Sequence, residues 1–203
     1  MIAVGALVTA SVVLDLQTLD WIVSSEASAV EYVSTLLWIV AALTTPFLIG
    51  RLSMNTVAAS ILCLGAAARE ADWHNSFTGY SVLKPAFFLR GEYSVAAKLV
   101  SGVVIATVVA SAVVVGCAGL HRARRAGGLR APWVQVGIFA LCLAAVSKSL
   151  DRAHDLLGVI GIRIAAAAQV SMVSVEEGLE LFLPALLMVT ALLYARDRPL
   201  SDV

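Results

Sequence analysis

Apolar runs of about 20 residues recur along the whole of this 203-residue sequence and constrain its fold more than any other feature. A run of that length forms a helix that crosses the roughly 30 Å hydrocarbon core of a bilayer. Because 60% of the residues are apolar, 14% are charged and the mean hydropathy is +0.92, we expect much of the folded surface to face lipid. Backbone groups left unpaired in lipid cost several kcal/mol each, and the runs lack the alternation of barrel strands. The sequence therefore predicts an all-α integral membrane protein.

Six transmembrane helices are predicted, packed as one bundle that makes residues 1–203 a single transmembrane helical domain. They cover residues 2–23, 29–49, 52–69, 94–120 and 132–150, and the sixth lies within 164–194. Residues 156–175 are apolar enough for a seventh span, which is the alternative. A seventh crossing would place Arg196 and Arg198 outside the cytoplasm, so we expect this stretch to be an extended or re-entrant segment leading into the sixth helix.

The orientation rests on residues 121–130, which hold four arginines and no acid: Arg122, Arg124, Arg125 and Arg130. Short loops rich in arginine stay in the cytoplasm, so both termini are predicted to be cytoplasmic, in a bacterial-type inner (cytoplasmic) membrane. Seven Lys or Arg residues fall on each side of this topology, and the totals tie. Those on the outer side are interspersed with acids, whereas the arginine-rich turn is not.

Composition also limits the partners. The formal net charge is zero and no surface suited to nucleic acid is evident, so no nucleic acid partner is expected. Cys63, Cys117 and Cys142 lie within apolar runs without a CxxC pair, which argues against disulfides and thiolate metal sites. Membrane lipids are the expected partners. Small residues such as Gly102 and Gly116 permit close helix contact, either with other membrane subunits or in a homo-oligomer.

The acidic residues gather at the predicted outer end of the bundle, and only Asp197 and Asp202 of the 14 acids fall at the inner end. The outer set is Asp15, Asp20, Glu26, Glu31, Glu70, Asp72, Glu92, Asp151, Asp155, Glu176, Glu177 and Glu180. Segments far apart in the sequence thus bring charge to one membrane face, as a site assembled between helices requires.

Two segments carry spacings that suit metal binding. Glu70 and His74 are four residues apart, with Asp72 between them, and share a face if the helix continues that far. Asp151 and His154 form a carboxylate-x-x-histidine pair of the kind that holds metals in helical bundles. We therefore expect Glu70, Asp72, His74 and His154 as metal ligands. The alternatives are an interfacial helix end with Trp73 in the aromatic belt, and salt bridges among Lys148, Asp151, Arg152 and Asp155.

Glu176, Glu177 and Glu180 directly precede an apolar run and give the strongest single signal. An ionised group at the bilayer centre costs about 2.5 to 3.5 kcal/mol on insertion scales, so these carboxylates need cations, protons or a water-filled cavity. We expect Glu177, Glu180 and Asp151 as catalytic carboxylates. The alternative is structural pairing with the cations Lys148, Arg152, Arg69 or Lys84.

Three cations are candidates for binding a substrate or lipid headgroup: Lys84, Arg90 and Arg152. Lys84 and Arg90 flank Phe87 and Phe88 in an outer loop, an order typical of a segment at headgroup depth. Plain anchoring of this loop is the alternative.

These features leave three hypotheses, and whether the chain is an enzyme stays open. The first is a hydrolase dependent on a divalent metal (Zn, Mn or Fe) that acts on a lipid or lipid-linked substrate. The second is a non-catalytic membrane subunit or scaffold of a larger complex, in which the outer charges form a structural ion-pair network and no cofactor is needed. The third is an ion or proton pathway, ranked last because the inner portions of the predicted spans between 29 and 150 carry no acid.

Overall fold

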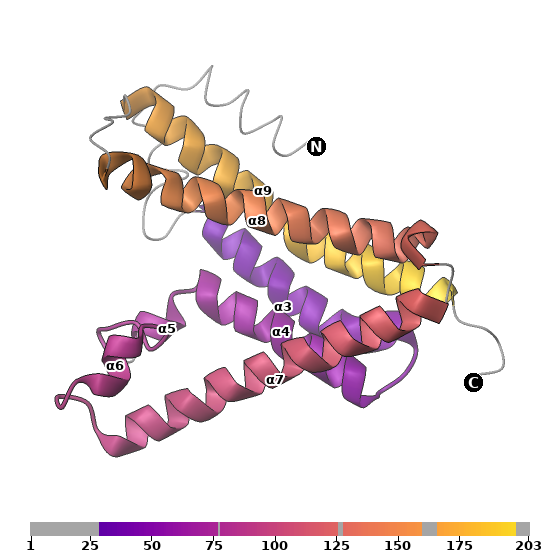
Figure 1. The fold of residues 1–203 in the computed structure, drawn as a ribbon, viewed down its shortest axis with the longest axis horizontal. Helices are drawn as coiled ribbons and strands as arrows, with labels where there is room; N and C mark the ends of the chain where they lie inside the picture. The colour runs from indigo at the N-terminus through magenta and orange to yellow at the C-terminus, as the bar shows by residue number, and fades with distance from the viewer. Residues whose placement is uncertain (1–28, 77, 126–127, 160–165, 198–203) are drawn as a thin grey trace.

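The computed structural model describes residues 29–76, 78–125, 128–159 and 166–197, and the regular elements in these ranges are all helical (Figure 1). The all-α prediction is therefore confirmed. The described residues form seven α-helices and one 3-10 turn: α3 (Ala29–Ile49), α4 (Met54–Glu70), α5 (Trp73–Ser76), α6 (Pro85–Leu89), α7 (Val95–Arg125), η1 (Gly128–Arg130), α8 (Pro132–Val159) and α9 (Ala166–Arg196).

Four of the described helices are long and apolar enough to cross a membrane. The candidate spans are Ala29–Ile49 in α3, Val95–Arg124 in α7, Pro132–Leu150 in α8 and Ser171–Arg196 in α9. Their length and composition indicate an integral membrane protein. Helix α4 has 17 residues and falls just short of this length, and the predicted span 2–23 lies outside the described residues. The six-helix count, the bacterial-type inner membrane and the cytoplasmic termini stay predictions.

The predicted boundaries are closest where local signals are strong. Helix α3 covers 29–49 as expected, and Gly50 follows it with a φ of +67°, a left-handed conformation that ends a helix. Helix α4 begins after Ser53, whose side chain accepts from the Thr56 amide while the Thr56 hydroxyl accepts from the Ser53 amide. Helix α8 begins with Pro132, a favoured residue at a first helical position.

Residues 156–175 differ from the prediction. The expected extended or re-entrant segment is wrong where the structure describes the chain, because α8 continues to Val159 and α9 already begins at Ala166. Residues 160–165 lie outside the described ranges. Alanine is the strongest helix former, and the run Ala166–Ala168 contains neither glycine nor proline, so helix propensity favours the helical conformation found there.

The long helices pack in a chain of neighbours: α8 lies against α9, α9 against α3, α3 against α4, and α4 against α7 (Figure 1). The core between α3 and α4 consists of Trp38, Ala41, Ala42, Cys63 and Ala67, with α9 packed on it through Leu183 and Met188. Small residues let these helices approach closely. Helix α7 is the least covered, since only 6% of its apolar stretch is buried.

The bundle has two chemically different ends. We call the first the carboxylate end, which carries Glu31, Glu70, Glu176, Glu177 and Glu180, and the second the arginine end, which carries Arg51, Arg122, Arg124, Arg130 and Arg196. Helices α3, α7 and α9 run from the carboxylate end to the arginine end, and α4 and α8 run back (Figure 1). The prediction that acids from distant segments gather at one end agrees with this arrangement.

Candidate functional site: an ion-pair network at the carboxylate end

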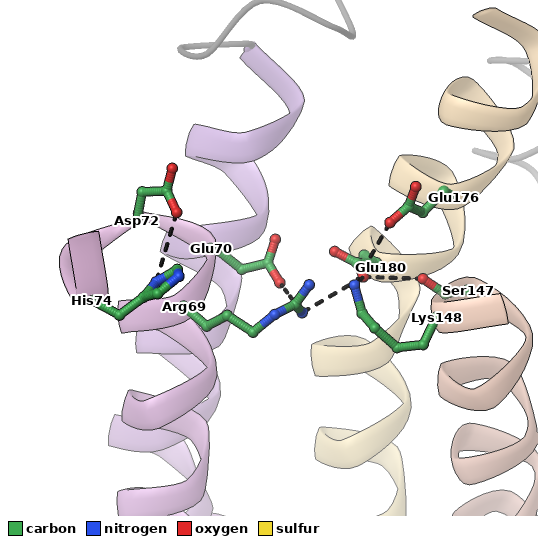
Figure 2. Close-up of polar contacts among 8 residues, drawn as sticks. All are labelled: Arg69, Glu70, Asp72, His74, Ser147, Lys148, Glu176 and Glu180. Atoms are coloured by element: carbon green, nitrogen blue, oxygen red, sulfur yellow. Dashed lines mark hydrogen bonds and ion pairs between the residues drawn. The ribbon is translucent and has the colours of Figure 1, made fainter. Parts of the chain in front are cut away.

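Glu180 of α9 is the centre of the carboxylate end, and it is only 5% exposed. Its Oε1 atom accepts a hydrogen bond from Ser147 Oγ of α8 at 3.0 Å and lies 2.6 Å from Lys148 Nζ of the same helix. Arg69 of α4 places Nη1 3.6 Å from the same oxygen (Figure 2). Donors from two other helices thus converge on one buried carboxylate.

The two cations each join a second carboxylate to Glu180. Lys148 Nζ lies 3.6 Å from Glu176 Oε1, and Glu176 and Glu180 are one helical turn apart, so both reach the same ammonium group. Arg69 Nη1 lies 3.3 Å from Glu70 Oε1, its neighbour in sequence. The result is a continuous network across α4, α8 and α9 (Figure 2).

Carboxylates outnumber cations in this network. Glu177 lies close enough to interact electrostatically with Glu180, Glu70, Glu176 and, from α3, Glu31. The side chain of Glu70, which lies beyond the four candidate spans, is 8% exposed. Burial first, and then the charge of Glu180, raises the pKa of Glu70 from its ordinary value to about 7, against the opposing charge of Arg69. Near neutral pH this carboxyl therefore holds a proton part of the time.

Two of the predicted ligands at the end of α4, Glu70 and His74, do not lie on one helix. Helix α4 ends at Glu70, and Asp72 turns the chain with a φ of +53°, so His74 belongs to the separate helix α5. The expected helical alignment of Glu70 with His74 is therefore wrong. Instead His74 Nδ1 lies 3.6 Å from Asp72 Oδ1, apart from the contacts to Glu180 (Figure 2). In the part of the chain that the structure describes, no group of three or more His, Cys, Asp or Glu residues could hold a metal ion.

The remaining predicted residues fall into two groups. Asp151 and His154 follow Lys148 on α8 toward the carboxylate end, but their side chains are outside what the structure describes, so their roles stay predictions. Arg152 is exposed. Lys84 and Arg90 both lie over the ring of Tyr80, with Lys84 Nζ at 5.5 Å and Arg90 Cζ at 4.4 Å from its centroid. Headgroup binding by these three cations also stays a prediction.

Two serines in the bundle were not anticipated from the sequence. Ser147 donates to Glu180, and Ser34 of α3 is 1% exposed with no hydrogen-bond partner for its hydroxyl among the described residues. Serine is too common in membrane helices to stand out. Its position next to Lys148 in the sequence could have indicated that Ser147 contacts the same carboxylate.

Comparison of the chain with protein-family models, with curated proteins and with solved structures gives no match. What the protein does must be inferred from its own geometry.

Proposed function

We propose that this chain is a non-catalytic membrane subunit or scaffold, in which the network around Glu180 fixes how its helices pack. The supporting observation is that one oxygen of Glu180 has Lys148 Nζ at 2.6 Å and Ser147 Oγ at 3.0 Å. A catalytic base or metal ligand needs a lone pair that is free to take a proton or an ion. The Oε1 atom of Glu180 is instead occupied by donors from its own bundle, which supports a structural role for this oxygen.

Such a network can determine which helices pack together in the membrane, and in which register. Lipid tails are as apolar as the helix surfaces, so apolar side chains alone do little to choose a neighbour or a register between helices. A buried ion pair is satisfied in few arrangements and can select one of them. The contacts of Glu180 with Arg69 and Lys148 therefore favour one alignment of α4, α8 and α9.

The surface of α7 suits a subunit that packs against another protein. Only 6% of its apolar stretch is buried. Gly116 lies on this helix, and a Cβ atom added there would meet no atom within 4 Å. A small residue on an uncovered helix allows close approach of another transmembrane helix, from a different subunit or from a second copy of this chain.

Replacing Glu180 tests the proposal. Glu180→Gln keeps the shape of the side chain but leaves two cations without their shared charge, so the thermal midpoint in detergent should fall by about 5 °C. Adding Lys148→Met to Glu180→Gln should cost less than Lys148→Met costs in the wild type, because the two side chains share one interaction. A midpoint unchanged by Glu180→Gln would contradict a structural network.

A metal-dependent hydrolase acting on a lipid or lipid-linked substrate is the second candidate function. The observation that favours it is Glu70, because a carboxyl with a pKa of about 7 suits general acid and base catalysis near neutral pH. Asp151 and His154, on the same end of α8, would have to complete a site for Zn, Mn or Fe.

Elemental analysis of the purified protein separates the two candidates. A hydrolase requires stoichiometric metal that is lost in His154→Ala, His74→Ala or Glu177→Gln while the protein stays folded. Metal-free protein, or equal metal content in all of these variants, would reject the hydrolase. Neither result depends on the stability of Glu180→Gln.

A further inference from the structure

The arginine end has a half-open cavity of about 200 Å³ between the helices. Its wall includes Ile49 of α3, Leu62 of α4, Val115 of α7, Trp133 of α8, and Leu187 and Tyr194 of α9. Thr45 and Thr190 also line it, but their hydroxyls donate to the carbonyls of Ala41 and Leu186 at 2.7 and 2.8 Å. Ser53, Asn55 and Thr56 at the start of α4 line it as well, but most of the surface that the cavity offers a ligand is apolar.

The cavity lies where α7 separates from the rest of the bundle. Val115, Ala118 and Gly119 of α7 form one wall, and Leu187, Ala191 and Tyr194 of α9 form part of the other. Helix α7 packs chiefly against α4, and Figure 1 shows it spreading away from α8 and α9 toward its start. Helix α7, which forms this wall, is hardly covered by the rest of the bundle, so in a bilayer acyl chains are the apolar groups next to the cavity.

Fixed positive charge surrounds the same end. The guanidinium of Arg122 lies 4.6 Å from the ring centroid of Tyr194, which lines the cavity. Arg51 and Arg130 are exposed and lie two and three residues from the lining residues Ser53 and Trp133. Asp197, the acid that the structure describes here, already accepts from Trp133 Nε1 at 2.9 Å. The surplus of cations complements an anionic headgroup.

From this combination, we propose that the arginine end binds an anionic glycerophospholipid, with one acyl chain in the cavity and its phosphate beside Arg51, Arg122 and Arg130. The site is independent of the function proposed for the carboxylate end. A neutral phospholipid would fill the cavity equally well but would gain nothing from the arginines.

Quenching of tryptophan fluorescence by brominated acyl chains measures occupancy of the cavity. Trp133 is 7% exposed and lines the cavity, so lipid merely surrounding the bundle quenches it poorly. The full chain is reconstituted into phosphatidylcholine vesicles that contain brominated phosphatidylglycerol or, at the same mole fraction, brominated phosphatidylcholine. We expect stronger quenching by phosphatidylglycerol, and we expect the difference to disappear in Trp133→Phe. Equal quenching by the two lipids, or a difference that survives in Trp133→Phe, would overturn the proposal.

Two glycines of α7 provide a matched pair of variants. A Cβ atom added at either Gly116 or Gly119 meets no atom within 4 Å, but only Gly119 lines the cavity. Gly119→Leu should therefore fill the cavity and abolish the quenching of Trp133, whereas Gly116→Leu should leave it intact. Equal effects of the two variants would overturn the assignment to this cavity.

The headgroup is tested separately. Arg51→Gln with Arg130→Gln removes two exposed cations and should weaken the apparent affinity for phosphatidylglycerol about 30-fold while leaving that for phosphatidylcholine unchanged. An unchanged preference for phosphatidylglycerol would overturn the role of the arginines.

Discussion

The carboxylate end and the arginine end use charge in opposite ways. At the carboxylate end, Glu180 is buried and its counter-charges come from the protein itself, at 2.6 Å from Lys148 and 3.6 Å from Arg69. At the arginine end, Arg124 and Arg130 are exposed, and the interior beside them is an apolar cavity. Charges turned inward restrict how helices pack, whereas charges turned outward attract groups from the surroundings. Whether a charged side chain points into the bundle or out of it therefore matters more for its role than whether it is positive or negative.

The largest expected difference between the two ends is in stability. Lys148→Met leaves Glu180 without its nearest cation, and we expect the free energy of unfolding in detergent to fall by about 3 kcal/mol, at the low end for a buried pair because Lys148 is 38% exposed. The matched change at the arginine end, Arg130→Met, should cost less than about 0.5 kcal/mol because this side chain is exposed.

Replacing both partners sharpens this result. In Lys148→Met with Glu180→Leu, no charge of the pair remains buried, so most of the lost stability should return. Similar losses for Lys148→Met and Arg130→Met would remove the distinction between the ends.

The second expected difference is in pH dependence. The pKa of Glu70 is about 7 in the folded chain and 4.5 without the fold, so between these values the folded state binds more protons than the unfolded state. Raising the pH from about 4.5 to 7 should therefore lower the contribution of Glu70 to stability, by on the order of 2 kcal/mol.

Unfolding by denaturant across this pH range measures the effect. In Glu70→Gln the corresponding slope should vanish, because the amide does not titrate. A slope that is the same in the wild type and in Glu70→Gln would show that other groups cause it.

A third and more modest loss of stability is expected from one hydrogen bond at the arginine end. Asp197→Ala removes the acceptor for Trp133 Nε1, and we expect a loss of about 1 kcal/mol together with a shift in Trp133 emission. Unfolding followed by fluorescence reports both. A loss larger than that of Lys148→Met would reverse the order of the two ends.

Much of the fold was predictable because length and apolarity decide membrane helices directly. The bounds of α3 follow from its apolar run and from Gly50, and the gathering of acids follows from topology. Contacts between side chains were less accessible, since they depend on helix rotation. Lys148 and Arg152 were equally plausible partners for Glu180, yet the structure places Lys148 on it and leaves Arg152 exposed. The predicted alignment of Glu70 with His74 required α4 to continue past Glu70. The positive φ of Asp72 instead turns the chain there, which the sequence did not reveal.

The short length of α4 has a consequence for the surrounding membrane. Its 17 residues are about 25 Å long, which is shorter than the roughly 30 Å hydrocarbon core, and its last two residues are the charged pair Arg69 and Glu70. Hydrophobic mismatch of this kind is relieved by local thinning of the bilayer or by long side chains that reach the surface. If α4 crosses the bilayer as the sequence predicts, the leaflet should thin beside its charged end, so that Arg69 and Glu70 meet water and not hydrocarbon.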